Sequence, residues 1–217
     1  AGAGYDSGYA ALYYPWFTVV DPSTGTARAV PPSGHVAGVW SGTGRGGVHE
    51  APANRVIEGA LELETRLAPA EAELLDSMGV NSIREFPGRS IRVWGARTLS
   101  SDANWRHLAV RRLVSYLEES IVTGTQWVVF EPNDERLWAA VRRSISAFLI
   151  EEWRTGALAG PTPDAAFFVR CDGETNTAEG IAAGQVVCEV GVAPLRPGEF
   201  VGFRVTQVAG STGLVTE

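Results

Sequence analysis

The sequence contains no lysine, only two cysteines and no long apolar run. Its 217 residues include 25 acidic side chains against 18 basic ones, all of them arginine, and the formal net charge is −7. An acidic chain without a block of basic residues is not expected to be a dedicated nucleic-acid-binding protein. No apolar run approaches the roughly 18 residues that a membrane-spanning helix needs, so no membrane insertion is expected.

The two cysteines are too few for a disulfide framework. Cys171 and Cys188 each lie in an apolar run, which favours buried free thiols and folding in a reducing compartment. The chain begins Ala1-Gly2-Ala3-Gly4, without an initiator Met and without a charged-then-apolar signal segment. We therefore expect this sequence to be the interior of a longer polypeptide.

The first predicted region covers residues 1–89. Residues 11–20 are aromatic and β-prone, and residues 21–25 form a turn signal. Pro31-Pro32-Ser33 offers the start of a short helix, although three glycines follow within it. Pro69 and Gly79 bracket a predicted helix over 69–78, and a short strand is predicted over 82–86.

The second predicted region covers residues 90–217 and has a clearer pattern. A strand is expected over 91–94, a long helix over 102–123, a buried strand over 126–130, and a second long helix over 134–155 capped by Pro132-Asn133-Asp134. Three β-type runs follow at 165–170, 185–192 and 199–208. The order predicts an α+β domain in which two long helices pack on one face of a sheet.

The motifs that would support catalysis do not form a site. Gly42–Gly47 matches G-x-G-x-x-G, but a nucleotide loop lies between a strand and a helix start, and Pro52 follows too soon here. His35, His49 and His107 have no metal-ligand spacing, and no G-x-S-x-G elbow is present. We predict no catalytic, cofactor-binding or metal-binding residues. A hydrolase or nucleotide-binding enzyme that uses Gly42–Gly47 is the less favoured alternative.

Several segments of the sequence closely resemble the tail sheath proteins of contractile phages and of phage-tail-like contractile injection systems. The resemblance covers about residues 8–208, in the same order along the chain. The segments that carry it are ALYYPW (11–16), VPPSGHVAG (30–38), APAN (51–54), FPGR (86–89), IRVWGARTLSS (91–101), TQWVVFEPND (125–134) and VAP (192–194).

The resemblance implies a structural role. Residues 1–89 would be the end of the middle sheath domain, which is named subtilisin-like but has no protease activity, and 90–217 would be the C-terminal sheath domain. Such subunits form rings or a helix around an inner tube, with six-fold symmetry expected. They contract to drive the tube through a target envelope. The other implied partners are the baseplate and tail-terminator proteins, and assembly in the bacterial cytoplasm is expected. A baseplate or terminator protein that shares the C-terminal domain is an alternative.

The resemblance also implies two sets of contact residues. Sheath subunits are linked by exchanged terminal strands, and here the alternating run 199–208 follows a Pro194–Gly198 segment that suggests a hinge. We expect it to pair with a neighbouring subunit, although closure of its own sheet remains open. Its residues are Phe200, Val201, Phe203, Val205 and Val208. The residues predicted to face an acidic inner tube are arginines of the two long helices: Arg106, Arg111, Arg112, Arg142 and Arg143. An ordinary solvated helix face remains an open alternative for them.

Overall fold

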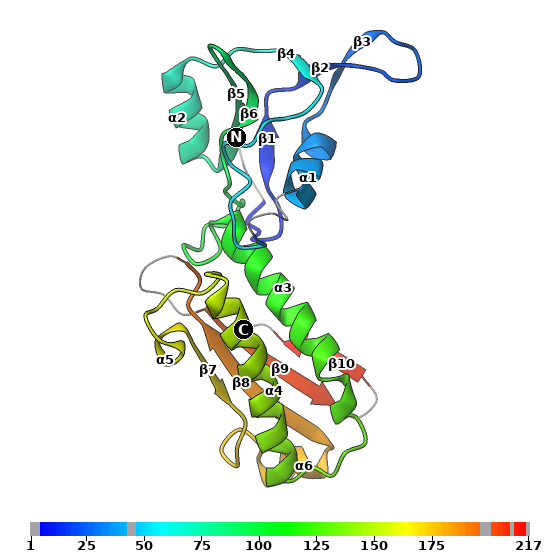
Figure 1. Cartoon of the computed structure of the whole chain (residues 1–217), viewed down its shortest axis with the longest axis vertical. Coiled ribbons are helices and arrows are strands. Elements are labelled where there is room, and N and C mark those ends of the chain that lie inside the picture. Colours follow the sequence, from blue (N-terminus) through cyan, green and yellow to red (C-terminus); the bar gives the residue numbers. More distant parts are fainter. Residues whose placement is uncertain (1–4, 43–46, 196–200, 209–210, 216–217) are drawn as a thin grey trace. The chain divides into compact units, whose positions relative to one another are not determined.

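The computed structural model describes residues 5–42, 47–195, 201–208 and 211–215, the last two ranges as backbone. The chain divides into two compact units, Ala1–Arg111 and Arg112–Glu217 (Figure 1). The division lies later than the predicted boundary between residues 89 and 90. The reason is that β6 (Arg89–Val93) pairs with β5 (Val80–Phe86), and so belongs to the first unit.

The first unit contains two small sheets. One has the order β1-β5-β6, in which β1 (Leu12–Tyr14) runs parallel to β5. The other has the order β3-β2-β4 and is antiparallel, with β2 (Phe17–Val20) between β3 (Ala27–Val30) and β4 (Ala60–Leu63). Helix α2 (Pro69–Ser77) packs on β5. It confirms the helix predicted over residues 69–78.

The aromatic run 11–20 supplies strands to both sheets. A cis Tyr14–Pro15 bond and Trp16 separate β1 from β2, so the single predicted β run is two strands. Helix α1 (Ser33–Gly42) forms despite its glycines, because Val36 on its inner face is buried in the core. That core combines residues from both sheets and α1, and its members are Phe17, Val19, Val36, Ile57, Leu63, Ile83, Ile91 and Val93.

A buried asparagine joins the segments of the first unit. The Asn81 side chain is fully buried, and its Nδ2 donates to the carbonyls of Leu12 (3.1 Å) and Arg97 (2.8 Å). Its Oδ1 accepts from the Arg97 backbone N–H at 2.7 Å. A Cβ at position 95 would lie 2.6 Å from the Asn81 Oδ1, so this close approach requires Gly95.

Replacing this asparagine is expected to destabilise the first unit strongly. Asn81→Leu keeps the volume but leaves buried backbone groups without partners, which costs about 3 kcal/mol of unfolding free energy. Denaturant unfolding, with amide exchange to assign the loss to residues 1–111, measures it. Asn104→Leu, at an exposed position, is the matched control and should change stability by less than about 0.5 kcal/mol. Equal losses in the two variants would contradict the assigned role.

The second unit is built on a four-stranded antiparallel sheet with the order β7-β8-β9-β10. Its strands are β7 (Phe167–Arg170), β8 (Gln185–Val192), β9 (Val201–Val208) and β10 (Ser211–Val215). Helices α3 (Leu108–Gly124) and α4 (Glu135–Arg154) lie over this sheet, with short α5 (Pro163–Ala166) and α6 (Ala178–Ala182) at its ends (Figure 1).

Helices α3 and α4 pack on each other and on the sheet. The Tyr116 hydroxyl of α3 donates to Glu152 Oε1 of α4 at 3.0 Å, and the Tyr116 ring lies 6.2 Å from that of Phe148. Ile121, Val141 and Val186 line one small cavity, so α3, α4 and β8 meet there. Burial and the Glu152 carboxylate raise the pKa of Tyr116 above its ordinary value. The fold therefore mixes helices and sheets, as the sequence predicts.

Three predicted elements need correction. The first long helix begins at Leu108 instead of residue 102, because residues 102–107 form an irregular segment in which the Arg106 carbonyl accepts from the Thr98 N–H. The predicted strand 126–130 is wrong: Gln126–Val128 is a single 3₁₀ turn, η2, in the connection between α3 and α4. The run 165–170 starts as the end of α5 and becomes strand β7 at Phe167.

Candidate functional site

The residues considered for catalysis do not converge. Residues 43–46 of the G-x-G-x-x-G motif lie outside the described residues, and helix α1 ends at Gly42, so a helix precedes the motif where a nucleotide loop needs a strand. The His35 ring packs edge-on against Phe17, with 5.0 Å between ring centroids. Among the described residues, no group of three or more His, Cys, Asp or Glu could hold a metal ion.

Within the described ranges, no helix is both long and apolar enough to cross a bilayer.

The five predicted tube-facing arginines do not form one exposed face. Arg111 is buried, with its guanidinium carbon 4.5 Å from the Tyr9 ring centroid and 4.2 Å from that of Trp105. The expectation that Arg111 is available to a partner is wrong, because these rings enclose its charge by cation–π contact. Arg106 is exposed but precedes α3 instead of lying on it.

The remaining three arginines differ in exposure. Arg112 is half-buried, and Arg142 is half-buried with its guanidinium donating to the Cys171 carbonyl. Arg143 is exposed on α4. Of the predicted tube-facing arginines that lie on α3 or α4, Arg143 is therefore the one that is exposed.

The predicted linking strand is a complete member of its own sheet in the single chain. β9 pairs antiparallel with β8 along all eight residues, from Val201 opposite Val192 to Val208 opposite Gln185, and β10 pairs on its other edge. Val201, Phe203 and Val205 stand in register with Val192, Val190 and Cys188, which are buried. Phe200 lies outside the described residues. A single chain contains no neighbouring sheet, so exchange between subunits stays a prediction.

Three apolar residues of the segment predicted as the buried strand 126–130 are exposed in the structure. Trp127, Val129 and Phe130, here called the apex, lie between α3 and α4 with exposed fractions of 44%, 36% and 98%. Phe130 has a φ of 71°, a left-handed conformation that a bulky side chain rarely adopts. The sequence does contain a signal for this connection. Gly124 and Pro132 lie close on either side of the apex, and they leave room for a connection between two helices but not for a paired strand.

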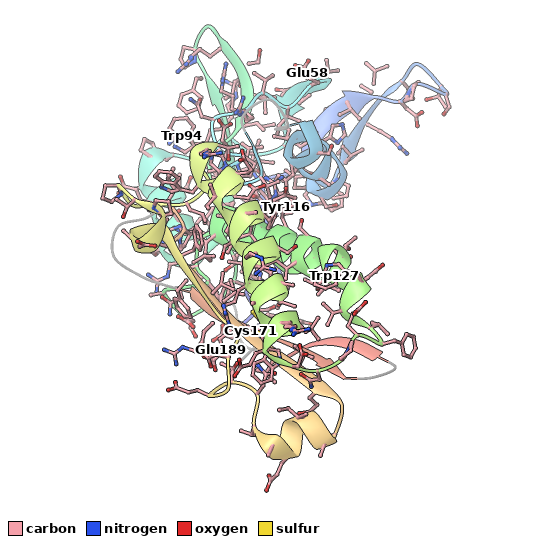
Figure 2. All side chains as sticks on the ribbon, turned by 60° about the horizontal axis from the view of Figure 1, so that its bottom comes forward. Glu58, Trp94, Tyr116, Trp127, Cys171 and Glu189 are labelled. Atoms are coloured by element: carbon pink, nitrogen blue, oxygen red, sulfur yellow. The ribbon has the colours of Figure 1, made fainter. Side chains whose placement is uncertain are left out.

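The apex has a rigid base. Val128, between the exposed residues, is buried, and the Thr125 hydroxyl donates to the Ile121 carbonyl at 2.7 Å. Asn133 accepts from the Trp138 indole N–H and donates to the Gln185 carbonyl, both at 2.8 Å. Figure 2 labels Trp127 near the C-terminal end of α3. The apex therefore holds exposed aromatic side chains on an ordered base, and neither this exposure nor the strained backbone of Phe130 stabilises the chain itself.

Asp134 completes the base by capping α4. Its carboxylate accepts from the backbone N–H groups of Arg136 (2.9 Å) and Leu137 (3.0 Å), which confirms the predicted cap.

Comparison with known proteins identifies the family. The model of the phage tail sheath protein central domain matches residues 3–99, and the model of the phage tail sheath C-terminal domain matches residues 100–207. The two matches follow one another and together cover nearly the whole chain. The chain belongs to the phage tail sheath protein family.

The chain is similar to curated proteins and to chains of solved structures. A prophage major tail sheath protein of Pseudomonas aeruginosa (strain UCBPP-PA14) is 28% identical over 198 residues, which cover 88% of this chain and 49% of that protein. A chain in the cryo-EM structure of the anti-feeding prophage baseplate, 6-fold symmetrised, is 38% identical with a TM-score of 0.83, and the match covers 90% of this chain and 54% of that one.

A third similar protein comes from a contracted assembly. A chain of the PVC sheath complex, an extracellular contractile injection system in its contracted state, is 37% identical with a TM-score of 0.82, and the match covers 89% of this chain and 54% of that one. The chain thus spans about half the length of these relatives.

Proposed function

We propose that this chain is the C-terminal half of a contractile tail sheath subunit, which polymerises around an inner tube and shortens to drive the tube through a target envelope. The observation that carries the proposal is the succession of central and C-terminal sheath domain models over residues 3–207. It is supported by similarity to the sheaths of the anti-feeding prophage and of PVC, which include contracted states. The particle is a phage tail or a phage-tail-like injection system assembled in the bacterial cytoplasm.

We assign the two units to the two sheath domains that the family models describe. The parallel pair β1–β5 with α2 packed on β5 supports assignment of the first unit to the end of the sheath domain named subtilisin-like. The two long helices over a four-stranded sheet support assignment of the second unit to the C-terminal sheath domain. The proposed role is structural and not enzymatic.

Contraction requires two packings of the same subunit that differ modestly in free energy. Links between subunits must therefore survive while side-chain interfaces rearrange. A strand exchanged between subunits meets this need, because backbone hydrogen bonds are independent of the side chains that slide. In our proposal β9 of one subunit pairs with β8 of its neighbour. It takes the edge of that strand on which β9 lies in the single chain.

The apex and Arg143 suit different partners. An exposed Phe130 gains most from burial, which favours a lasting contact between sheath subunits. An exposed arginine makes a weak, salt-sensitive contact, which favours a surface that must release the tube during contraction. We therefore assign the apex to a neighbouring sheath subunit and Arg143 to an acidic tube surface.

Arg143→Glu is expected to weaken co-assembly with tube protein by about two- to fivefold per contact at low salt, the range for one exposed ion pair. The difference should vanish near 1 M salt, where the Debye length falls to about 3 Å. Co-sedimentation of sheath and tube protein measures the effect. Arg89→Glu changes an exposed arginine of the first unit and is the control. Unchanged co-assembly at low salt would remove Arg143 from the tube contact.

Electron microscopy of the full-length subunit tests the overall proposal. A sheath forms hollow tubes or stacked rings, alone or around tube protein. The second candidate, a baseplate protein that shares these domains, is favoured by the match to a chain of a baseplate structure and would give single rings that do not elongate. Small monodisperse particles under all assembly conditions would contradict both.

A further inference from the structure

The two free cysteines face each other across neighbouring strands. β7 and β8 are antiparallel, and their register runs from Phe167 opposite Val192 to Arg170 opposite Glu189. One further step sets Cys171, directly after β7, opposite Cys188. Both side chains are buried, with exposed fractions of 0% and 4%, and the two thiols hydrogen-bond to each other. Figure 2 shows Cys171 close to Glu189, the residue after Cys188.

The backbone geometry at this pair follows from Asn176. Its side-chain Oδ1 accepts from the Val187 N–H at 2.7 Å, and its Nδ2 donates to the Val187 carbonyl at 3.1 Å. Asn176 belongs to the segment that continues from β7, so the polar backbone groups of Val187 face that side of β8. Because these groups alternate along a strand, those of Cys188 face β9. Cys171 and Cys188 are thus a non-hydrogen-bonded pair, the type in which Cα atoms lie about 4.5 Å apart and side chains are closest.

That spacing falls within the range of disulfides, whose Cα atoms usually lie about 4.4–6.8 Å apart.

The surroundings differentiate the two thiols. The hydrogen bond from Cys188 lowers the pKa of Cys171. Burial raises this pKa, but the Asn176 amide, 3.8 Å from the Cys171 sulfur, and the positive charge of Arg142 lower it further. The hydrogen bond to Cys171 and burial raise the pKa of Cys188. One sulfur is therefore favoured as a thiolate and the other as its proton donor, which is the arrangement that starts thiol–disulfide exchange.

We propose that Cys171 and Cys188 form a reversible disulfide between β7 and β8 when the folded chain meets a small-molecule disulfide. Both sulfurs are buried, so the first step is a local opening at the end of β7 that exposes Cys171. The Cys171 thiolate then attacks one sulfur of that oxidant and releases the first small thiol. Cys188 then loses its proton and attacks the Cys171 sulfur of the mixed disulfide, releasing the second. Two protein thiols are oxidised, and one small disulfide is reduced to two thiols.

The bond would act on the strand that carries the proposed subunit link. β8 holds β7 on one edge and β9 on the other, so a covalent tie to β7 fixes the edge on which β9 pairs. A subunit would fold reduced in the cytoplasm and become tied once its particle reaches an oxidising exterior. The disulfide itself does not depend on the proposed function, because it requires only the pair in this sheet.

Oxidised glutathione at neutral pH, added to the folded full-length subunit, provides the test. Intact-mass spectrometry should show the loss of two hydrogens without a glutathione adduct, and proteolysis should give one peptide pair linked through Cys171 and Cys188. Even a short loop of this kind is worth about 3 kcal/mol when it is closed, so the melting temperature of the second unit should rise by at least about 5 °C. Dithiothreitol should reverse both changes.

Two single variants distinguish a reaction of the cysteine pair from independent reactions of two cysteines. Cys188→Ser should stop at the glutathione adduct, because the resolving thiol is missing, and Cys171→Ser should react at least about tenfold more slowly than the native chain. If either variant folds poorly, the mass and the melting temperature of the oxidised native chain are sufficient to test the proposal. A folded chain that keeps both thiols under oxidised glutathione, or a disulfide that lowers the melting temperature, would overturn the proposal.

Discussion

Phe130→Gly is expected to leave the folded subunit as stable as before, or more stable, and to impair assembly of the sheath. The left-handed conformation of Phe130, with its φ of 71°, costs an L-residue about 1–2 kcal/mol. Glycine avoids that cost and adds about 0.5–1 kcal/mol of chain entropy on unfolding. Since Phe130 is 98% exposed, no packing is lost. The net change in unfolding free energy is between zero and a gain of about 1.5 kcal/mol.

Assembly should respond in the opposite direction. Full burial of a phenylalanine side chain is worth about 2–3 kcal/mol, so removing it should raise the concentration needed for polymerisation by at least about tenfold. Sedimentation of sheath assembled without tube protein measures this and leaves out any tube contact. Phe130→Tyr keeps the ring and should assemble nearly as the native subunit does.

Asn54→Gly is the matched control for backbone relief. Asn54 also has a positive φ, of 60°, and is exposed, but it carries no aromatic ring. It should leave the assembly threshold unchanged. Native-like polymerisation of Phe130→Gly would show that the apex is not a subunit contact, and a large loss of stability would show that the ring packs within the subunit.

The apex also illustrates what the sequence could predict. Helix α4 could be predicted from its apolar periodicity and from Asp134. The capping hydrogen bonds of Asp134 involve only neighbours two and three residues away. Residues 126–130 have strong β propensity, yet no strand is available to pair with them between two packed helices. Tertiary context therefore overrode local preference, which is a weak guide for short segments.

The burial of Arg111 could not be predicted from the sequence for a similar reason. The family resemblance suggested that helix arginines face a tube, but exposure depends on contacts made far along the chain. Tyr9 reaches Arg111 from about a hundred residues upstream, and that separation leaves no local pattern. The alternation in 199–208 did predict a strand, and β9 confirms it, whereas an alternating pattern cannot identify the partner strand.

Subunits with cysteines at positions 189 and 204 are expected to form covalent ladders when the assembled sheath is oxidised. Glu189 and Arg204 stand opposite each other in the β8–β9 register. The backbone of Glu189, two residues from Val187, faces β7, so toward β9 this is a non-hydrogen-bonded pair with closely spaced side-chain positions. Glu189→Cys with Arg204→Cys, in a Cys171→Ser, Cys188→Ala background, can therefore close a disulfide wherever β9 lies on β8.

The state of assembly determines which molecules are joined. In dissociated subunits β9 pairs with its own β8, as in the single chain, so oxidation should give only cross-linked monomers on a non-reducing gel. If β9 is exchanged in the sheath, the same oxidation joins each subunit to the next and gives dimers, trimers and higher species. Most subunits should appear in the ladder, because each contributes one strand and accepts one.

Each single-cysteine variant should give no ladder, which removes accidental contacts between surface thiols. The native subunit provides a second control, since Cys171 and Cys188 lie on adjacent segments of one sheet and should join only within a chain. Cross-linked monomers alone in well-formed tubes would mean that β9 stays in its own sheet. The links that survive contraction would then have to come from elsewhere in the subunit, because closed sheets share no backbone hydrogen bonds with their neighbours.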